Sequence, residues 1–263
     1  MLRLSRRLPM RLAGAGALTV ALAAASLPAA AADNSFTDKQ RSEIEAIVRD
    51  YLVRNPEVLV EVSNALQQKQ EAAAAAEQKD AIKAQAALLT GGDNQIVLGN
   101  PQGDVSLVMF FDYNCGYCRR SAEDIFTLMD KDPKLRVVLK EFPILTEGSV
   151  EAARVALGVE AVAPDKYAAF HRALFRINGP ADGASAMKVA TGLGLDKAAI
   201  EAAMQKPEVT ATLQQTHELA QALQISGTPS YVVGDSILPG AVGVATLQQR
   251  IDTVRKCGGA SSC

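Results

Sequence analysis

The sequence predicts an α/β domain preceded by a helical segment, and a contrast between two regions of the chain supports this prediction. Residues 36–89 are polar and rich in alanine, with almost no β-forming residues after Val62. From Gln95 onward, apolar runs typical of buried strands alternate with helical patterns. Because alternating strands and helices indicate an α/β fold, we expect one such domain on the C-terminal side.

The first 32 residues have the layout of a secretory signal peptide. Four arginines come first, an apolar stretch runs from about Leu12 to Leu27, and alanines at 30–32 provide a small-residue cleavage site before Asp33. An uncleaved membrane anchor is the alternative, but the alanine-rich stretch is only weakly apolar. We therefore expect export to the periplasm, an oxidising compartment where disulfides persist.

The charge of the exported chain argues against a nucleic-acid partner. Without the four arginines of the signal peptide, 23 of the 27 basic residues remain against 29 acidic ones, a net charge of −6. A mildly acidic chain with no tryptophan offers no basic stripe for a phosphate backbone. We therefore expect no nucleic-acid partner.

Residues 33–91 predict a helical stalk. The apolar residues of its first half follow one face of a helix: Ile44, Ile47, Val48, Tyr51 and Leu52. Asn55 and Pro56 interrupt this pattern, with the asparagine placed to cap a second helix and the proline at its first position. The second helix continues through an alanine- and charge-rich stretch that presents little to bury.

A narrow apolar stripe with no core of its own must be covered by something else. Leu59, Val62 and Leu66 fit a coiled-coil seam, although the alanine and lysine residues that follow do not extend it. We expect the stalk to associate with copies of itself. A solvated spacer helix is the other interpretation.

Residues 92–256 predict the α/β domain itself. Strands are expected at 105–111, 135–142, 230–233 and 236–238, and helices at about 116–129 and 244–255. Residues 149–224, between the second and third of these strands, are mostly helical and predict a helical insertion. The glycine- and serine-rich residues 257–263 predict a flexible tail.

Cys115 and Cys118 form a Cys-x-x-Cys unit after the first predicted strand. Such a pair can bind zinc, form a structural bridge, or cycle between dithiol and disulfide. Structural zinc needs four ligands, and the spacing of Cys257 and Cys263 does not match a paired site. A bridge that closes so short a loop stabilises little. The pair therefore predicts redox chemistry.

The position of Cys115 favours it as the nucleophile. It lies where a strand ends and a helix begins, so unpaired backbone N–H groups and the positive end of the helix stabilise its thiolate. Cys118 follows one turn later, where burial keeps its proton until it resolves a mixed disulfide. Gly116 and Tyr117, between the two thiols, help to set the redox potential.

A second signal is the Gly-Thr-Pro sequence at 227–229, directly before a predicted strand. A proline in that position needs a structural reason, and a cis Thr228–Pro229 peptide bond provides one. An ordinary trans proline in a loop is the alternative.

These motifs resemble a known family. The segments FFDYNCGYCRR, KEFPIL (140–145) and ISGTPSYVV (225–233) resemble the DsbA superfamily of thioredoxin-fold thiol:disulfide oxidoreductases, and more narrowly its ScsC-like and DsbG-type members. The segment VRDYLVRNPEVLVE (48–61) is similar to the N-terminal segment of ScsC-like proteins, which drives oligomerisation in some of them. The resemblance implies a thioredoxin fold with an inserted helical block over residues 95 to about 255.

The same resemblance implies roles for the motif residues. Cys115 and Cys118 become the redox pair, and Pro229 becomes the cis-proline that faces the nucleophile. Thr228 then helps to tune the thiolate and presents its backbone to an extended substrate.

One position departs from the family pattern. Many relatives carry a buried glutamate six residues before the nucleophile, whereas this chain has Met109 there. Glu141 or Lys140, on the neighbouring predicted strand, is a candidate for the missing proton-transfer role. Asp112 is expected to be exposed or helix-capping rather than catalytic.

Cys257 and Cys263 lie outside the family motifs. In an oxidising compartment, a small disulfide within the tail is the leading interpretation. Reactive, metal-binding or interchain roles are the alternatives.

The resemblance implies an enzyme that needs no cofactor, a periplasmic thiol–disulfide oxidoreductase that acts on secreted proteins and is reset by a membrane redox partner. A stalk that gathers several active sites favours disulfide isomerase or reductase activity over simple oxidation, with a trimer favoured and a dimer as the alternative. Two other functions remain open. One is a monomeric DsbA-like dithiol oxidase, and the other is a copper-tolerance protein whose Cys115 and Cys118 bind Cu(I).

Overall fold

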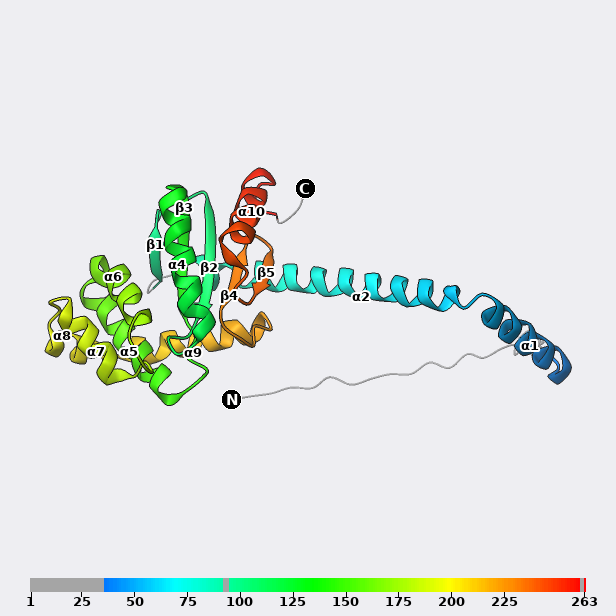
Figure 1. Cartoon of the computed structure of the whole chain (residues 1–263), viewed down its shortest axis with the longest axis horizontal. Coiled ribbons are helices and arrows are strands. Elements are labelled where there is room, and N and C mark those ends of the chain that lie inside the picture. Colours follow the sequence, from blue (N-terminus) through cyan, green and yellow to red (C-terminus); the bar gives the residue numbers. More distant parts are fainter. Residues whose placement is uncertain (1–35, 92–94, 261–262) are drawn as a thin grey trace, which may run out of the picture. The chain divides into compact units, whose positions relative to one another are not determined.

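The computed structural model describes residues 36–91, 95–260 and 263 (Figure 1). The predicted signal peptide, residues 1–32, lies outside the described residues. The chain divides into two compact units between Val62 and Ser63, so residues 63–91 of the predicted stalk belong to the second unit. Within the described ranges, no helix is both long enough and apolar enough to cross a membrane.

The first unit consists of helix α1 (Asp38–Arg54) and the beginning of helix α2 (Glu57–Ala84). Thr37 caps α1, because its hydroxyl accepts the Gln40 N–H while the Gln40 side chain accepts the Thr37 N–H. The break between the helices falls where the sequence predicted it. The role of Asn55 differs, however, since its side-chain amide donates to the Tyr51 carbonyl at 2.8 Å and so caps the end of α1.

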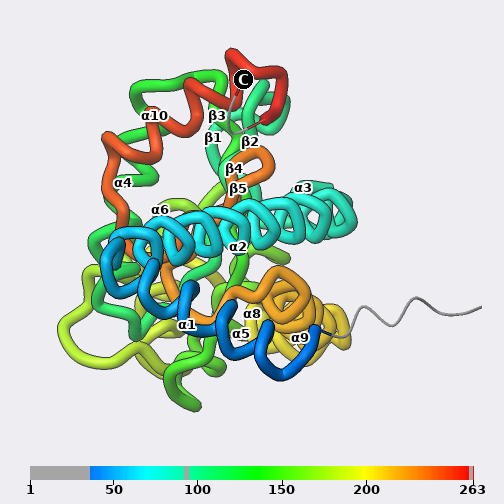
Figure 2. The backbone as a smooth tube through the Cα atoms, turned by 90° about the vertical axis from the view of Figure 1, so that its right-hand side faces the viewer, coloured from blue at the N-terminus to red at the C-terminus, as the bar shows by residue number. Residues whose placement is uncertain are grey.

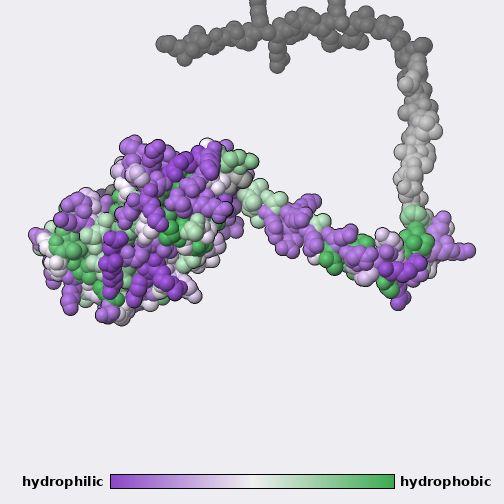
Figure 3. Space-filling view, turned by 45° about the horizontal axis from the view of Figure 1, so that its top comes forward, coloured by the Kyte–Doolittle hydropathy of each residue, from purple (hydrophilic) through white to green (hydrophobic). Residues whose placement is uncertain are grey.

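The apolar stripe of the first unit faces solvent in the single chain. No residue of α1 is buried. Figure 3 shows apolar side chains (green) between hydrophilic ones along this helical segment. Among the residues of the stripe, Ile47, Val48 and Tyr51 have exposed fractions of 67%, 50% and 54%. The stripe on α1 is therefore present as predicted and has no cover within its own unit.

A five-stranded sheet forms the centre of the second unit. Its strands are β1 (Ile96–Gly99), β2 (Val105–Phe111), β3 (Leu135–Glu141), β4 (Ser230–Val233) and β5 (Ser236–Pro239). Their order is β1-β3-β2-β4-β5, with β2 and β3 parallel and the other neighbours antiparallel. Strand β2 lies in the middle of the sheet, which explains why it is a continuous apolar run.

Four of these strands were predicted from the sequence, and β1 was not. It has only four residues and pairs with β3 at one edge of the sheet, where Ile96 lies opposite Leu139. A short apolar run next to glycine and asparagine does not have enough alternation to identify a strand.

Helices cover both faces of the sheet (Figure 1). Helix α4 (Gly116–Lys131) follows β2, and α10 (Gly243–Lys256) ends the domain. The predicted helical insertion between β3 and β4 is present as five helices, α5 (Glu147–Val162), α6 (Pro164–Phe175), α7 (Gly183–Gly192), α8 (Lys197–Met204) and α9 (Pro207–Ala222). A short helix, α3 (Ala86–Thr90), lies between α2 and β1 in the chain.

The two faces of β2 contribute to two separate cores. Met109 and Phe111 point into the larger core, which includes residues of α4, α6 and α10. Val108 and Phe110 point into a smaller core with residues from the end of α2, from α3 and from α9. Because successive side chains of a strand point to opposite faces, this one strand supports both cores.

The C-terminal part of α2 packs against the domain. Ile82 and, from α3, Leu89 are buried in the smaller core, although the sequence suggested that this stretch has little to bury. Near them, the Gln78 side chain accepts the Ile237 N–H of the edge strand β5 at 3.2 Å, and Lys79 pairs with Asp235 at 3.1 Å. Figure 2 shows this part of α2 (cyan) beside β5 (orange).

Candidate active site

Cys115 is the N-cap residue of α4, at the strand–helix junction that the sequence predicted. Its sulfur accepts the Cys118 N–H at 3.2 Å, and its thiol donates to the Thr228 carbonyl oxygen, also at 3.2 Å. A sulfur in this position faces the positive end of the helix dipole. A helix N-terminus with a backbone N–H donor is a position in which nucleophilic cysteines are found.

Cys118 lies one helical turn further on and is completely buried, whereas Cys115 keeps an exposed fraction of 7%. Both cysteines are free thiols. Burial raises the pKa of the Cys118 thiol far above its ordinary value. Cys118 is thus the more buried of the two residues, as predicted, and burial favours its protonated form.

The two residues between the cysteines face solvent. Gly116 is exposed, with no atom within 4 Å of the position that a Cβ would occupy. Tyr117 has an exposed fraction of 60%, and the Arg120 guanidinium lies 4.8 Å from the centre of its ring. The dipeptide thus forms the solvent-facing rim of the site.

The Thr228–Pro229 peptide bond is cis, as the sequence predicted. The proline is buried, and the Thr228 carbonyl accepts the Cys115 thiol. Two segments that are far apart in the chain therefore meet at one sulfur atom.

Asp112 corrects a prediction, because it is buried with an exposed fraction of 1%. One carboxylate oxygen accepts the Asn114 N–H at 2.8 Å and the Ser149 hydroxyl at 2.7 Å. The other accepts the N–H groups of Ile144 and Leu145 at 2.9 and 3.0 Å. The carboxylate thus ties the turn before Cys115 to the segment that follows β3.

Asn114 fixes the same turn to the helical insertion and was missed by the sequence analysis. Its side chain accepts the Ala181 N–H at 2.7 Å and donates to the Ala181 carbonyl at 2.8 Å. It also donates to the Ser149 hydroxyl at 2.9 Å. Asp and Asn in a short segment before a helix are a signal for a side-chain-stabilised turn, but the partners in the insertion cannot be identified from the sequence.

The register of the sheet distinguishes the two candidates for the role missing at Met109. Lys140 points to the smaller core, where its ammonium donates to the Leu88 carbonyl at 2.7 Å and to the Gln95 side chain at 2.6 Å. Glu141 lies opposite Phe111 and points to the larger core, which also contains both active-site cysteines. Only Glu141 is on the same side of the sheet as the thiols.

Glu141 belongs to a buried chain of polar side chains. The Tyr167 hydroxyl donates to Glu141 at 2.9 Å, the Tyr113 hydroxyl lies 3.3 Å from that of Tyr167, and His171 Nδ1 lies 3.0 Å from the Tyr113 hydroxyl. Burial raises the pKa of Glu141 well above its usual range and lowers that of His171 to about 3. Burial therefore favours the neutral form of both groups.

No group of three or more histidine, cysteine or acidic side chains in the described ranges is arranged to hold a metal ion. The predicted tail disulfide is present, since Cys257 and Cys263 are bonded to each other. Cys115 and Cys118 are therefore the only free thiols among the described residues.

Comparison with known proteins agrees with this geometry. Residues 106–252 match the sequence family described as the DSBA-like thioredoxin domain. Residues 40–73 match the family described as the copper resistance protein ScsC N-terminal domain.

Solved structures and curated relatives are similar over most of their length. A crystal structure of a thioredoxin-like oxidoreductase from Silicibacter pomeroyi is 46% identical, covers 65% of this chain and 97% of its own, and superposes with a TM-score of 0.62. ScsC from Proteus mirabilis in a transitional conformation is 29% identical over 84% of this chain and 100% of that chain, also with a TM-score of 0.62. The thiol:disulfide interchange protein DsbL of Escherichia coli O6:H1 is 26% identical over 67% of this chain and 90% of that protein.

A thioredoxin-type sheet that brings a Cys-x-x-Cys helix start and a cis-proline together is characteristic of thiol–disulfide oxidoreductases, and this chain is one of that class. The matched domain covers more than half of the chain, so the chain belongs to the DsbA-like thioredoxin family. Its N-terminal match makes it, more narrowly, an ScsC-like member of the DsbA superfamily.

Proposed function

We propose that this protein is a periplasmic disulfide isomerase or reductase for secreted proteins, with Cys115 as nucleophile and Cys118 as resolving thiol. The observation that supports this most directly is the contrast between the two sulfurs. Cys115 keeps an exposed fraction of 7% at a helix N-terminus with an N–H donor, whereas Cys118 is fully buried behind it. The predicted signal peptide supports export, and a similar structure from Salmonella enterica, 27% identical, is described as a periplasmic thioredoxin-like protein.

The reaction begins when the Cys115 thiolate attacks one sulfur of a substrate disulfide. A bond forms between Cys115 and that sulfur, the substrate S–S bond breaks, and the other substrate sulfur leaves as a thiolate. In isomerisation, a substrate thiolate attacks the mixed disulfide, releases Cys115 and leaves a rearranged disulfide with no net redox change. In reduction, Cys118 attacks instead, and the resulting Cys115–Cys118 disulfide must be reduced by a dithiol of a membrane partner.

The first unit supports isomerisation because its exposed apolar stripe suits self-association. Ile44, Val48, Leu52 and Leu59 border a shallow hollow of about 520 Å³ whose lining is almost entirely apolar. A second copy of the same helices would cover these side chains. Several sites held together in this way form a surface that can retain a misfolded chain, with a trimer as the favoured copy number and a dimer as the alternative.

The test of the chemistry is the recovery of a test protein with scrambled disulfides. We expect the reduced wild type to restore its activity and Cys115→Ser to be inactive. Cys118→Ser should isomerise but leave mixed disulfides that accumulate, because the resolving thiol is missing. If the wild type reduces small disulfides but restores no scrambled protein, the isomerase assignment is wrong and the reductase assignment stands.

The test of assembly is the solution mass of residues 33–263 by light scattering. Val48→Glu places a charge in the stripe, and Ala46→Glu places the same charge on the opposite side of α1, where the side chain is also exposed. We expect an oligomer for the wild type and for Ala46→Glu and a monomer for Val48→Glu. A monomeric wild type would eliminate the shared stalk, and the protein would then be a single-site, DsbA-like oxidase or reductase.

Copper binding is a second candidate function, because the N-terminal match is to a family described as a copper resistance protein. Paired sulfurs one helical turn apart suit Cu(I), a soft ion. We expect Cu(I) loading of the reduced protein to be lost in Cys115→Ser if the site is the binder. Loading that persists in this variant would exclude the active site as the copper ligand.

A further inference from the structure

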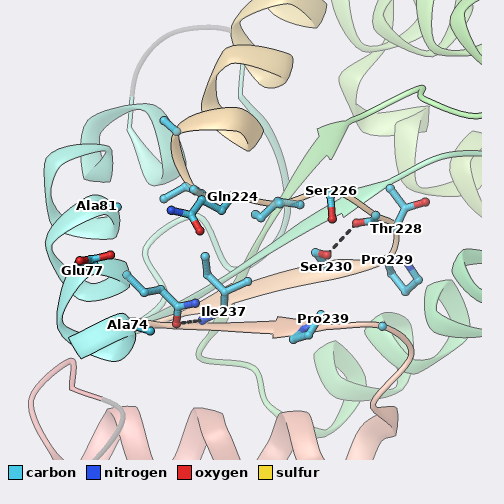
Figure 4. Close-up of a pocket in the computed structure, with 16 residues that line it drawn as sticks. Ala74, Glu77, Ala81, Gln224, Ser226, Thr228, Pro229, Ser230, Ile237 and Pro239 are labelled. Atoms are coloured by element: carbon cyan, nitrogen blue, oxygen red, sulfur yellow. Dashed lines mark hydrogen bonds between the residues drawn. The ribbon is translucent and has the colours of Figure 1, made fainter. Parts of the chain in front are cut away.

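A pocket of about 470 Å³ adjoins the active site, and helix α2 forms one of its walls (Figure 4). The opposite wall is the segment from the end of α9 to the cis-proline, and the edge strand β5 closes the third side. This volume is in the range of binding pockets in general. The pocket and the thiol site share Thr228, which lines the pocket and whose carbonyl accepts the Cys115 thiol.

The wall formed by α2 consists of one helical face. Ala74, Glu77, Gln78 and Ala81 line the pocket, and these positions follow the spacing i, i+3, i+4, i+7. Gln78 attaches this face to β5 through its bond to the Ile237 N–H. The alanines at 74 and 81 have short side chains, so they leave the space between the helix and the loop open, as Figure 4 shows.

The facing loop offers unused backbone donors. In the described chain, the N–H groups of Ser226, Gly227 and Thr228 donate no hydrogen bond. Ser226 and Gly227 are exposed, and Thr228 is half-buried. Free backbone N–H groups beside an open pocket can donate to carbonyl groups of an extended polypeptide bound there.

The pocket also carries one uncompensated charge. Glu77 is its only charged lining residue, it is exposed, and it forms no ion pair among the described residues. An extended segment with a lysine or arginine near its cysteine would therefore complement this wall better than an acidic segment.

We propose that the α2 face of Ala74, Glu77, Gln78 and Ala81 is the second wall of a substrate channel. Its occupant is an extended segment of a secreted protein, preferably basic, whose cysteine forms the mixed disulfide with Cys115. This inference rests on the proposed thiol–disulfide exchange at Cys115. It adds that helix α2 takes part in substrate binding as well as in any association of the stalk.

The experiment compares peptide and non-peptide substrates with the full mature chain in its reduced form. Two peptides of equal length carry one cysteine as a mixed disulfide with 2-mercaptoethanol, flanked either by lysines or by glutamates. The rate of 2-mercaptoethanol release reports attack by Cys115. The third substrate, 2-hydroxyethyl disulfide, is neutral. It is too short to extend from Cys115 into the channel while it reacts.

A tryptophan at position 74 fills the channel, and one at position 72 is the matched control. Ala72 and Ala74 are both exposed in the same alanine run, but only Ala74 lines the pocket. We expect Ala74→Trp to slow both peptides at least about tenfold, equivalent to about 1.4 kcal/mol, and to leave 2-hydroxyethyl disulfide unaffected. Ala72→Trp should behave as the wild type with all three substrates.

A second pair of variants tests the charge. We expect the wild type to prefer the lysine peptide by about two- to fivefold, the range of an exposed ion pair, and Glu77→Lys to reverse the preference. Glu71→Lys, which makes the same change of charge one turn before the pocket lining, should not. If the peptide rates are unchanged in Ala74→Trp, or if Glu77→Lys still prefers the lysine peptide, the channel proposal is wrong. The proposed exchange reaction is not affected by either result. No attack on 2-hydroxyethyl disulfide by the wild type would instead overturn the proposed function, and the channel with it.

Discussion

The buried carboxylate of Asp112 leads to a quantitative prediction for Asp112→Asn. Each of its two oxygens accepts two hydrogen bonds, from Asn114 and Ser149 on one side and from Ile144 and Leu145 on the other. An asparagine has nearly the same shape but keeps only one acceptor oxygen. Its NH₂ group must then face two donors, so two bonds to a charged acceptor are lost.

Hydrogen bonds to charged groups contribute about 1.5 to 3 kcal/mol each. We therefore expect Asp112→Asn to lower the free energy of unfolding by about 3 to 6 kcal/mol, measured for the reduced protein by urea denaturation at pH 7. Asp130→Asn, an exposed position on α4, is the control and should change it by less than about 0.5 kcal/mol. A loss below about 1 kcal/mol for Asp112→Asn would refute the conclusion that this carboxylate holds the active-site turn.

Two further predictions concern groups away from the active-site thiols. The lowered pKa of His171 contributes stability above pH 6.5, and this contribution is lost as the pH falls toward about 3. The raised pKa of Glu141 contributes stability below pH 4.5, and that contribution is lost as the pH rises. The two effects oppose each other between pH 4.5 and 6.5. In Glu141→Gln the stability should therefore rise with pH in this range, more steeply than in the wild type by up to about 1.4 kcal/mol per pH unit; parallel curves would contradict this. Replacing Cys257 and Cys263 by serine should cost about 2 kcal/mol or less and leave exchange activity and solution mass unchanged, and a change in either would point to a role beyond the tail.

The central strands and the thiol site could be predicted because their signals are local. Strand β2 is a continuous apolar run, and Cys115 and Cys118 follow it directly. The cis-proline was predictable for the same reason, since Gly-Thr-Pro precedes a strand within a few residues. Each of these features depends on neighbours in the chain.

The supports of the site could not be predicted, because their partners are remote in sequence. The donors to Asp112 include residues 32 to 37 positions away, and those to Asn114 lie as far as 67 positions away. The choice between Lys140 and Glu141 depended on which face of β3 each occupies. A strand that is buried on both faces gives no polar alternation from which to assign it, so only the pairing of Glu141 with Phe111 decided the question.

The division of β2 between two cores has a consequence for genetic analysis of this protein. Leu107, Met109 and Phe111 support the side with the cysteines, whereas Val108 and Phe110 support the side that holds the end of α2. Alleles that shorten the side chains of the odd-numbered residues should have the same phenotype as cysteine alleles in a selection for thiol chemistry. Alleles at even-numbered residues should instead cluster with those of Ile82 and Leu89. A saturation library over the five codons 107–111 can therefore separate defects in the thiol site from defects in the packing of α2 against the domain.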